Sequence, residues 1–453
     1  MGAPRRHLGI GAAASLIVQI APLVGMTLVS VVVARRLGPD ATGTIALLSS
    51  ILEVLLAIFG FGLATGITYF TSRGEWSVRH ALRESQALAL PLGCIGVGLG
   101  CAFFALTRDE LFAGISVVSL LLGIGYLPFQ LGRGFIAAIA LARERYEAYA
   151  AVELVRTAVL IAVAVVLTFL IGVDGALIGI AASGVISYVA AAVWAVRYAG
   201  VAQETAQAGG GRMREAMTFG SKAWGATLLQ LINYRLDLFL LAAYVARADV
   251  GRYSVALSVT ALAWVLPAAL ETVIFPRTAD LHAAHDRGEI AATESDAATA
   301  RAVRHSVLLL APATIIVLLL VVVAVPLLYG PAFTEAVWFG LILIPGVVGL
   351  SVGKTLSAVV TGRGRPHYAL LTTLITVPLT VALYLLLIPP LGAYGAALAS
   401  TVSYLTATGL ALVWFRRTTQ IPLRTALVPS RAELRDYLDA LANVRRRLRT
   451  RAV

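Results

Sequence analysis

The sequence predicts an all-α polytopic membrane protein with twelve transmembrane helices in two parallel six-helix lobes. Its composition, the length of its apolar runs and an internal repeat support this prediction. Apolar residues make up 59% of the 453 positions and charged residues 13%, with a mean hydropathy of +0.86. Soluble domains are about 45–50% apolar and about 25% charged. The composition therefore excludes a soluble enzyme, a disordered chain and a secreted disulfide scaffold.

Twelve apolar runs are long enough to cross a bilayer, whose hydrocarbon core needs about 20 residues of helix. They lie at residues 9–33, 45–70, 86–106, 111–137, 151–171, 174–197, 222–245, 252–276, 306–328, 335–360, 368–388 and 393–415. Short turns separate them, among them Gly38-Pro39-Asp40, Gly172-Val173-Asp174 and Pro389-Pro390. The runs are continuous rather than alternating, which excludes a membrane β-barrel.

The basic residues predict which helix ends face the cytoplasm. With both termini in the cytoplasm, 26 of the 36 basic residues fall in cytoplasmic segments. Five fall in the outer loops, namely Arg35, Arg36, Arg108, Arg247 and Arg252. Cytoplasmic loops of membrane proteins carry such an excess of Lys and Arg. We therefore expect cytoplasmic N- and C-termini, and we attribute the net charge of +12 to topology rather than to nucleic-acid binding.

The chain repeats itself once. A shift of 220 residues aligns polar and small residues, which aliphatic low complexity does not explain. The aligned pairs are Arg143 with Arg363, Arg145 with Arg365, Gly175 with Gly395, Ser183 with Ser403 and Trp194 with Trp414. Nearer the start, a shift of 208 aligns Gly43 with Gly251. Parallel repeats build many secondary transporters. We expect an N-terminal lobe over residues 1–200 and a C-terminal lobe over 201–417.

The remaining residues, 418–453, form a basic tail that we expect in the cytoplasm. Ser430 and Glu433 have the spacing of a capping box, and Leu434 and Leu438 follow at helical intervals. Arginines are dense from Arg445 onward. This pattern predicts an amphipathic helix beside anionic headgroups. The alternative is a solvated basic tail that only enforces topology.

Four segments resemble bacterial polysaccharide flippases. They are Ala34–Gly43 (ARRLGPDATG), Asn233–Asp237, Asp249–Ala256 and Val273–Arg277. Over residues 8–417 the chain resembles the Wzx-like oligosaccharide flippases of the multidrug/oligosaccharidyl-lipid/polysaccharide exporter superfamily. The resemblance implies two lobes around a central cavity that opens alternately to each face. Lipid II flippases of this superfamily carry charges in their first helix, whereas residues 8–33 hold none.

The resemblance implies a flippase that moves a polyprenyl-diphosphate-linked oligosaccharide across the bacterial cytoplasmic (inner) membrane for cell-surface polysaccharide biosynthesis. It implies as partners the lipid-linked glycan, the lipid bilayer and glycan-assembly enzymes, and neither a cofactor nor an enzymatic reaction. One alternative is a drug or organic cation antiporter of the same superfamily, which needs an acidic cavity. A second is a membrane glycan polymerase or ligase, which needs a long catalytic outer loop that the sequence lacks.

Three basic residues inside the predicted spans are candidate ligands for the diphosphate: Arg133, Arg235 and Lys354. An ionisable group in a span is costly and usually faces a cavity or a partner. Arginine suits phosphate through its planar fork and lysine through its point charge. We expect Arg133 and Lys354 to face each other across the lobes, with snorkelling to the interface as the alternative. Glu153 and Arg156, at i and i+3, are expected to neutralise each other.

Three acidic residues are candidates for coupling transport to a proton or sodium ion. Glu53 in the second span has no charged neighbour in sequence, and Glu271 follows Pro267 in the eighth span. Asp237 in the seventh span shares a helix face with Asn233. For Asp237 the alternative is a contact that only joins two helices. The His, Cys, Asp and Glu residues form no set that predicts a metal site.

Overall fold

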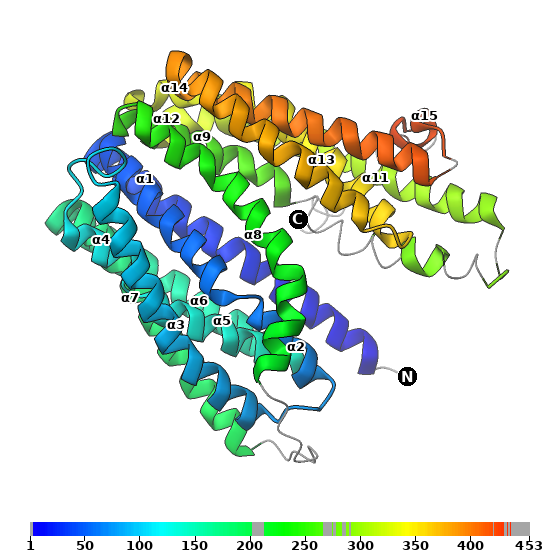
Figure 1. The fold of residues 1–453 in the computed structure, drawn as a ribbon, viewed down its shortest axis with the longest axis horizontal. Coiled ribbons are helices and arrows are strands. Elements are labelled where there is room, and N and C mark those ends of the chain that lie inside the picture. The colour runs from blue at the N-terminus through cyan, green and yellow to red at the C-terminus, as the bar shows by residue number, and fades with distance from the viewer. Residues whose placement is uncertain are drawn as a thin grey trace, which may run out of the picture. The chain divides into compact units, whose positions relative to one another are not determined.

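A computed structural model describes residues 3–201, 213–265, 274, 278–282, 287–289, 291–419, 421–429, 433 and 435. This part of the chain is almost entirely helical and contains no strand (Figure 1). The α-helices are α1 (Ala3–Gly60), α2 (Leu63–Ser72), α3 (Val78–Leu106), α4 (Val117–Ile124), α5 (Leu127–Ala142), α6 (Tyr146–Val159), α7 (Val165–Val201), α8 (Met213–Tyr244), α9 (Arg247–Thr260), α11 (Ala292–Leu319), α12 (Val325–Tyr329), α13 (Thr334–Gly362), α14 (His367–Thr418) and α15 (Leu423–Leu427). Two π-helical segments, η1 (Leu160–Ala164) and η3 (Leu320–Ala324), and two 3-10 segments, η2 (Ala261–Trp264) and η4 (Pro331–Phe333), complete it.

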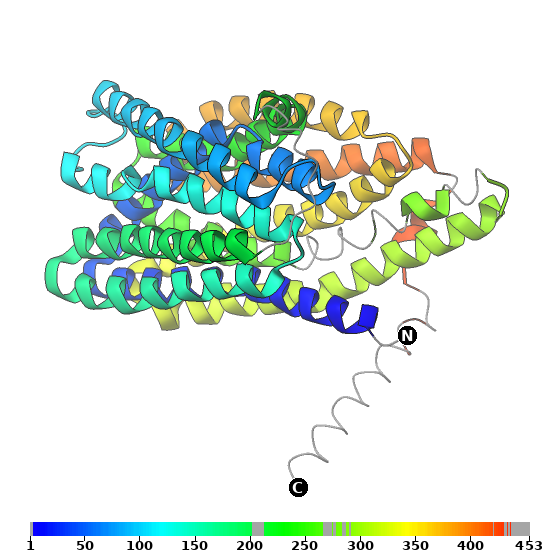
Figure 2. The ribbon, with the colours of Figure 1, turned by 90° about the horizontal axis from the view of Figure 1, so that it is seen from below.

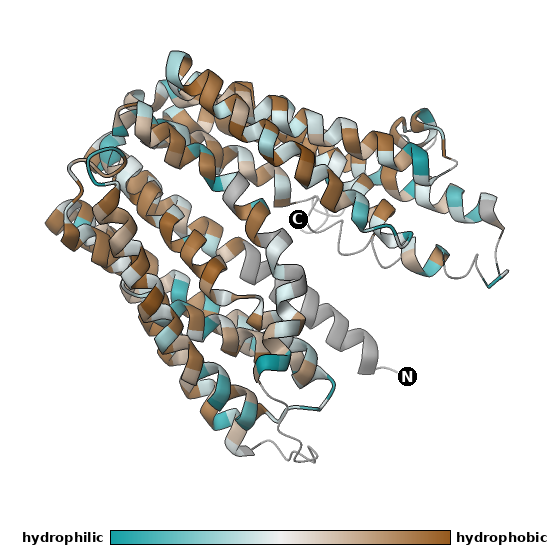
Figure 3. Cartoon of the chain, viewed as in Figure 1, coloured by the Kyte–Doolittle hydropathy of each residue, from teal (hydrophilic) through white to brown (hydrophobic). Residues whose placement is uncertain are grey.

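Seven helical stretches of the described residues are long and apolar enough to cross a membrane. They are Ile20–Gly60, Val78–Leu106, Val117–Ala142, Tyr146–Gly200, Thr293–Tyr329, Pro331–Gly362 and His367–Thr418. Figure 3 shows apolar residues along these helices and hydrophilic residues towards many of their ends. Large apolar side chains such as Leu106, Leu170 and Leu386 are exposed, as expected where helices face lipid. The all-α membrane fold is confirmed, and the twelve-helix, two-lobe layout stays a prediction.

Three of the seven stretches are interrupted by a glycine with a left-handed φ. The φ angle is 85° at Gly38, 68° at Gly172 and 56° at Gly392. Glycine adopts this conformation without the steric penalty of a Cβ atom. At Gly392 the chain of α14 turns back on itself. Tyr384 Oη and Ser400 Oγ, on either side of the break, therefore lie only 2.8 Å apart. The breaks fall at or beside the turns predicted from the sequence.

The two copies of the repeat share local backbone structure. The same three backbone hydrogen bonds close a turn in each copy. In the first copy they run from Arg143 to Ile139, from Glu144 to Leu141 and from Arg145 to Ala140. In the second copy, 220 residues later, they run from Arg363 to Val359, from Gly364 to Thr361 and from Arg365 to Val360. The middle residue has a positive φ in both copies, 55° at Glu144 and 75° at Gly364. Gly172 and Gly392 also stand 220 residues apart, with ψ angles of −136° and −133°. These matches support the internal repeat.

The chain packs into two compact units. Unit 1 comprises Met1–Ser254 and Leu327–Phe333, and unit 2 comprises Val255–Pro326 and Thr334–Val453. Within unit 1, α3, α5 and α7 run alongside one another (Figures 1 and 2). Packing defines these units and the sequence repeat defines the predicted lobes, so the lobe boundaries stay a prediction.

In unit 1, α8 packs closely on α2. A Cβ atom at Gly62 would meet the carbonyl oxygen of Gly220, and a Cβ at Gly220 would meet that of Gly62. Small residues allow membrane helices to approach in this way. Phe61 stacks on Trp224 with ring centroids 4.5 Å apart. The span predicted over residues 45–70 is broken here, because Phe61 and Gly62 take φ angles of 47° and 65°.

In unit 2, the residues that follow α14 are fastened to α11. Arg304 Nη2 lies 2.9 Å from Glu433 Oε1, and Arg304 also donates to the carbonyl oxygen of Thr425. Ala426 of α15 is fully buried. Glu433, which the sequence assigned to a capping box with Ser430, thus pairs with α11. Apart from Glu433 and Arg435, the predicted tail helix lies outside the described residues.

Candidate functional site

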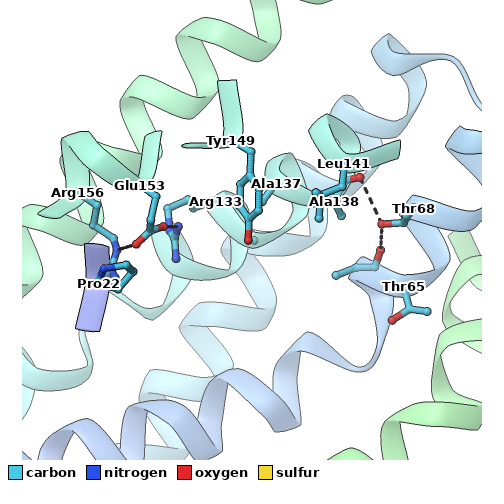
Figure 4. Close-up of a pocket in the computed structure, with 12 residues that line it drawn as sticks. Pro22, Thr65, Thr68, Arg133, Ala137, Ala138, Leu141, Tyr149, Glu153 and Arg156 are labelled. Carbon is cyan, nitrogen blue, oxygen red and sulfur yellow. Dashed lines mark hydrogen bonds and ion pairs between the residues drawn. The ribbon is translucent and has the colours of Figure 1, made fainter. Parts of the chain in front are cut away.

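Three charged side chains join α5 to α6 in unit 1 (Figure 4). Arg133 Nη1 lies 2.8 Å from Glu153 Oε2, and Arg156 Nε lies 2.5 Å from Glu153 Oε1. Arg133 Nε also donates to Gln130 Oε1 at 2.9 Å. The Glu153 side chain is only 4% exposed. Two cations therefore share one buried anion, and the group carries an excess of one positive charge.

Local packing directs Arg133 towards α6. Its neighbour Gly132 has no room for a side chain, because a Cβ atom there would meet the ring of Tyr188 and the amide oxygen of Gln86. Gln86 Nε2 donates to the carbonyl oxygen of Gly132 at 3.1 Å, which holds α3 against α5. On α6, the i and i+3 spacing places Glu153 and Arg156 on one face. The ion pair predicted between them is observed, and Arg133 joins it.

These charges line a cavity of about 490 Å³, which we call the Arg133 cavity. Its lining comprises Pro22, Ala64, Thr65, Thr68, Arg133, Gly134, Ala137, Ala138, Leu141, Tyr149, Glu153 and Arg156 (Figure 4). The Thr68 hydroxyl lies 3.3 Å from the carbonyl oxygen of Ala138, so α2 is linked to α5 at the cavity wall. Guanidinium groups, the Tyr149 phenol and the Thr65 hydroxyl on an apolar wall provide hydrogen-bond donors for an anion.

A second ion pair links the second predicted span to the seventh. Arg235 on α8 lies against Glu53 on α1, with Nη2 2.5 Å and Nε 2.6 Å from Glu53 Oε2. Both side chains are accessible, Glu53 at 41% and Arg235 at 32%. The sequence assigned Arg235 to phosphate binding and Glu53 to ion coupling. The structure brings these two candidates together as partners.

Asp237 lies two residues beyond Arg235 and has a different environment. Its side chain is 1% exposed. Oδ1 accepts from the backbone amide of Leu238 at 2.7 Å, and Oδ2 accepts from the Tyr253 hydroxyl at 3.1 Å. Asp237 therefore joins α8 to α9, which is the contact named above as the alternative to an ion site. Its predicted coupling role stays a prediction.

Lys354 belongs to unit 2 and lies on α13. Its Nζ atom is 5.2 Å from the ring centroid of Trp264, a cation–π distance. The Trp264 ring meets that of Tyr404 edge-on at 5.9 Å. Arg133 belongs to unit 1, so the expected pairing of Arg133 with Lys354 stays a prediction. Glu271 and the side chain of Asn233 lie outside the described residues.

Unit 1 also contains a larger cavity, which the sequence did not indicate. It has a volume of about 740 Å³, and we call it the Asp40 cavity. Its lining comes from residues 37–47, 110–114, 173 and 242–250 and includes Asp40, Glu110, Tyr244 and Arg247. All four segments adjoin connections that the arginine distribution predicts on the outer side. Among the described residues, no group of three or more His, Cys, Asp and Glu can hold a metal ion.

Sequence reasoning identified charged residues and missed what surrounds them. The sequence did not single out Gln130, Tyr149 and Thr68, because uncharged polar residues are common in membrane helices. The pairing of Glu53 with Arg235 joins positions 182 apart, and a single sequence carries no signal of such a contact. The internal repeat did carry a signal of one long-range contact. The shift of 208 residues aligns Gly43 with Gly251, and these two glycines lie against each other in the structure.

The fold is that of a polytopic membrane protein, with charged side chains on the walls of its cavities. The sequence profile described as "polysaccharide biosynthesis protein" matches residues 32–338, more than half of the chain. The chain therefore belongs to the polysaccharide biosynthesis protein family. This family agrees with the resemblance to Wzx-like oligosaccharide flippases seen in the sequence, and the relatives and solved structures that the chain resembles are flippases and transporters.

One curated relative is the probable low-salt glycan biosynthesis flippase Agl15 of Haloferax volcanii, 26% identical over 169 residues. The match spans 37% of this chain and about a third (35%) of that protein's length. Among solved structures, the lipid II flippase MurJ in an inward closed conformation aligns with a TM-score of 0.66 and 13% identity, over 92% of this chain and 88% of its own.

Two further solved structures share the fold. An inward-facing multidrug resistance transporter of the MATE family has a TM-score of 0.65 and 17% identity, covering 89% of this chain and 97% of its own. A multidrug/oligosaccharidyl-lipid/polysaccharide (MOP) superfamily transporter from Pyrococcus furiosus, described as having a binding pocket of reverse polarity, has a TM-score of 0.57 and 16% identity, covering 92% of this chain and 96% of its own. These likenesses show the fold.

Proposed function

We propose that this protein is a flippase that moves a polyprenyl-diphosphate-linked oligosaccharide from the cytoplasmic to the outer leaflet by alternating access. The observation that carries this proposal is the group of Arg133 and Arg156 around one buried carboxylate on the wall of a cavity. The family description and the name of the Haloferax relative support a role in glycan export. The cargo would serve cell-surface polysaccharide biosynthesis beside glycan-assembly enzymes.

The Arg133 cavity suits the charged part of such a cargo. A diphosphate offers several acceptor oxygens, and guanidinium groups bind phosphate through paired, charge-assisted hydrogen bonds. Small-molecule sites measure about 300–1,000 Å³, so a cavity of about 490 Å³ suits a diphosphate with an adjoining sugar rather than a whole repeat unit. Arg235 and Lys354 are proposed as further ligands that the diphosphate meets along its path.

Ion coupling is proposed at Glu53, Asp237 and Glu271. Protonation of Glu53 would release Arg235 from its ion pair and make that guanidinium available to phosphate. Asp237 is buried beside a hydroxyl donor, so binding a proton or a cation there would alter the contact between α8 and α9. An isolated charge inside a membrane helix is costly. Changes of protonation at these positions therefore have structural consequences.

The drug or cation antiporter is the second candidate, because MATE transporters share the fold. An organic cation needs an anionic binding surface. The three charged residues of the Arg133 cavity sum to +1, which favours an anionic cargo over a cation. Transport of organic cations by the purified protein would support the antiporter.

The test is leaflet-resolved quantitation of lipid-linked glycan in bacterial cells depleted of the protein. We expect full-length lipid-linked units to accumulate on the cytoplasmic leaflet and to decline on the outer leaflet. The Arg133→Gln variant should fail to restore export, whereas Arg36→Gln, an exposed arginine outside the cavity, should restore it. An unchanged leaflet distribution on depletion would overturn the proposed function. A tag at each terminus would test the proposed inner-membrane topology. We expect protease to cleave both tags only when it is added on the cytoplasmic side.

A further inference from the structure

The Asp40 cavity is the second ligand-sized cavity of unit 1, and its chemistry differs from that of the Arg133 cavity. We infer that it is a carbohydrate-binding site that takes the neutral, hydroxyl-rich part of the cargo on the extracytoplasmic side. The inference rests on the proposed function for its cargo and on the proposed topology for its side of the membrane. The cavity itself is described wholly within unit 1.

The frame of the cavity is closely packed. A Cβ atom at Gly43 would meet the carbonyl oxygen of Arg247, and one at Gly251 would meet that of Pro39. Each Cβ would also meet the backbone nitrogen of the other glycine, and the two glycines stand 208 residues apart, the shift found in the sequence. The start of α9 is thus pressed backbone to backbone against α1 just after Gly38. Glycines at both positions are required by this approach, and they fix one wall of the cavity.

The opposite wall is the loop between α3 and α4. Phe112 is fully buried, and its ring centroid lies 5.3 Å from that of Phe104 on α3. Arg247 donates to the carbonyl oxygen of Ala113 and so ties this loop to α9. The loop thus contacts both α3 and α9, and it places Glu110 in the lining of the cavity.

The charges of the cavity disfavour a diphosphate. Asp40 and Glu110 are both exposed carboxylates, and Arg247 is the basic residue of the lining. The sum is −1, opposite in sign to the Arg133 cavity. A diphosphate is repelled by such a surface, whereas sugar hydroxyls donate to carboxylates and accept from a guanidinium.

The shape and the remaining surface also fit a sugar. Tyr244 is 51% exposed at the cavity and offers an aromatic face with a hydroxyl at its edge. Leu37, Leu47 and Val250 provide an apolar floor. At about 740 Å³ the cavity lies within the size range of small-molecule sites and exceeds the Arg133 cavity by about half. A divalent cation is less suited, since the lining holds two carboxylates and one cation.

The test uses the full-length protein in nanodiscs and measures binding by calorimetry and saturation-transfer NMR. The neutral probes are maltotriose, chitobiose and mannotriose, and the anionic probe is inorganic pyrophosphate. We expect at least one neutral probe to bind, and the Asp40→Asn/Glu110→Gln double variant to bind it at least tenfold more weakly. Tyr244→Ala should weaken it, and Tyr244→Phe should retain most of the affinity. The matched control, Asp109→Asn, changes an adjacent exposed carboxylate outside the lining and should leave binding unchanged.

The two cavities give separable outcomes. Arg133→Gln should weaken pyrophosphate binding and leave neutral probes unaffected, while the double variant should do the reverse. Thermal unfolding of each variant checks that it is folded. The inference is overturned if no neutral probe binds the wild-type protein, or if the double variant binds as well as wild type. Calcium binding that the double variant loses, without binding of any sugar, would make this a cation site. Because sugar binding is measured without transport, these outcomes do not depend on the leaflet assay.

Discussion

The Arg133 cavity and the Asp40 cavity belong to the same packed unit and differ in charge and burial. In the Arg133 cavity, a buried carboxylate is shared by two arginines, and the sum is +1. In the Asp40 cavity, exposed carboxylates stand beside one arginine, and the sum is −1. The two cavities share no lining residue.

The comparison of the two cavities shows where a charged residue contributes to the stability of the fold as well as to the proposed binding of a ligand. Buried ions are costly to leave unpaired, whereas exposed ones remain solvated. The same type of substitution is therefore expected to have unequal effects at the two cavities. Stability measurements distinguish the two cavities before any ligand is identified.

The largest expected effect is that of Glu153→Gln. The change leaves Arg133 and Arg156, whose side chains are 19% and 15% exposed, without their shared buried anion, which costs up to about 3–5 kcal/mol. The free energy of unfolding in detergent, measured by denaturant titration, checks this. Glu110→Gln is the matched control and should stay within about 0.5 kcal/mol of wild type. Equal losses at the two positions would remove the contrast in burial between the cavities.

The next effect is expected at the frame of the Asp40 cavity. Gly43→Val forces a side chain against the backbone of Arg247, and such overpacking costs about 1–3 kcal/mol. Gly98→Val is the control, because Gly98 has open space around the position of its Cβ. We expect the melting temperature to fall for Gly43→Val only, together with neutral sugar binding. Similar melting temperatures for both variants would contradict the described contact of α1 with α9.

The Glu53–Arg235 pair is intermediate, since both side chains are accessible. A double-mutant cycle with Glu53→Gln and Arg235→Gln should give a coupling in stability of about 0.5–1 kcal/mol. Transport should respond more strongly, because Arg235→Gln removes a proposed phosphate ligand, and we expect export to fall at least tenfold. Glu53→Arg/Arg235→Glu should recover stability without recovering export. Recovery of both would show that the pair serves only to join α1 and α8.

For Lys354→Ala we expect a loss of stability no larger than the coupling energy of the Glu53–Arg235 pair. A cation–π contact at a partly accessible site contributes about 0.5–1 kcal/mol. Lys354→Arg keeps the charge and the contact with Trp264 and serves as the control. Export should fall in Lys354→Ala and persist in Lys354→Arg. Export that is unchanged in Lys354→Ala would exclude this residue as a phosphate ligand and leave the proposed cations to unit 1.

The sequence predicted the class of fold because lipid imposes strong constraints on a chain. Apolar runs of span length, turns at Gly38 and Gly172, and the distribution of arginine all follow from the bilayer itself. The same reasoning did not predict the breaks at Phe61 and within residues 111–137. Those breaks depend on tertiary contacts, such as the approach of Gly62 to Gly220.

Of the candidate site, the sequence predicted the ionisable residues and one pair. Glu153 and Arg156 were expected to pair because their spacing alone places them on one helix face. Glu53 and Arg235, Asp237 and Tyr253, and the Asp40 cavity depend on which helices are neighbours. A single sequence contains no record of that, so these groupings appear only in the folded chain.

The turn that occurs twice, at Arg143–Arg145 and at Arg363–Arg365, makes each half of the chain a reference for the other. The same left-handed position holds Glu144 in one copy and Gly364 in the other. A left-handed conformation costs a residue with a Cβ atom about 1–2 kcal/mol, and the added freedom of an unfolded glycine offsets part of any gain. Exchanging residues between the aligned copies, beginning with Glu144→Gly, is thus a way to find substitutions that raise the stability of the protein.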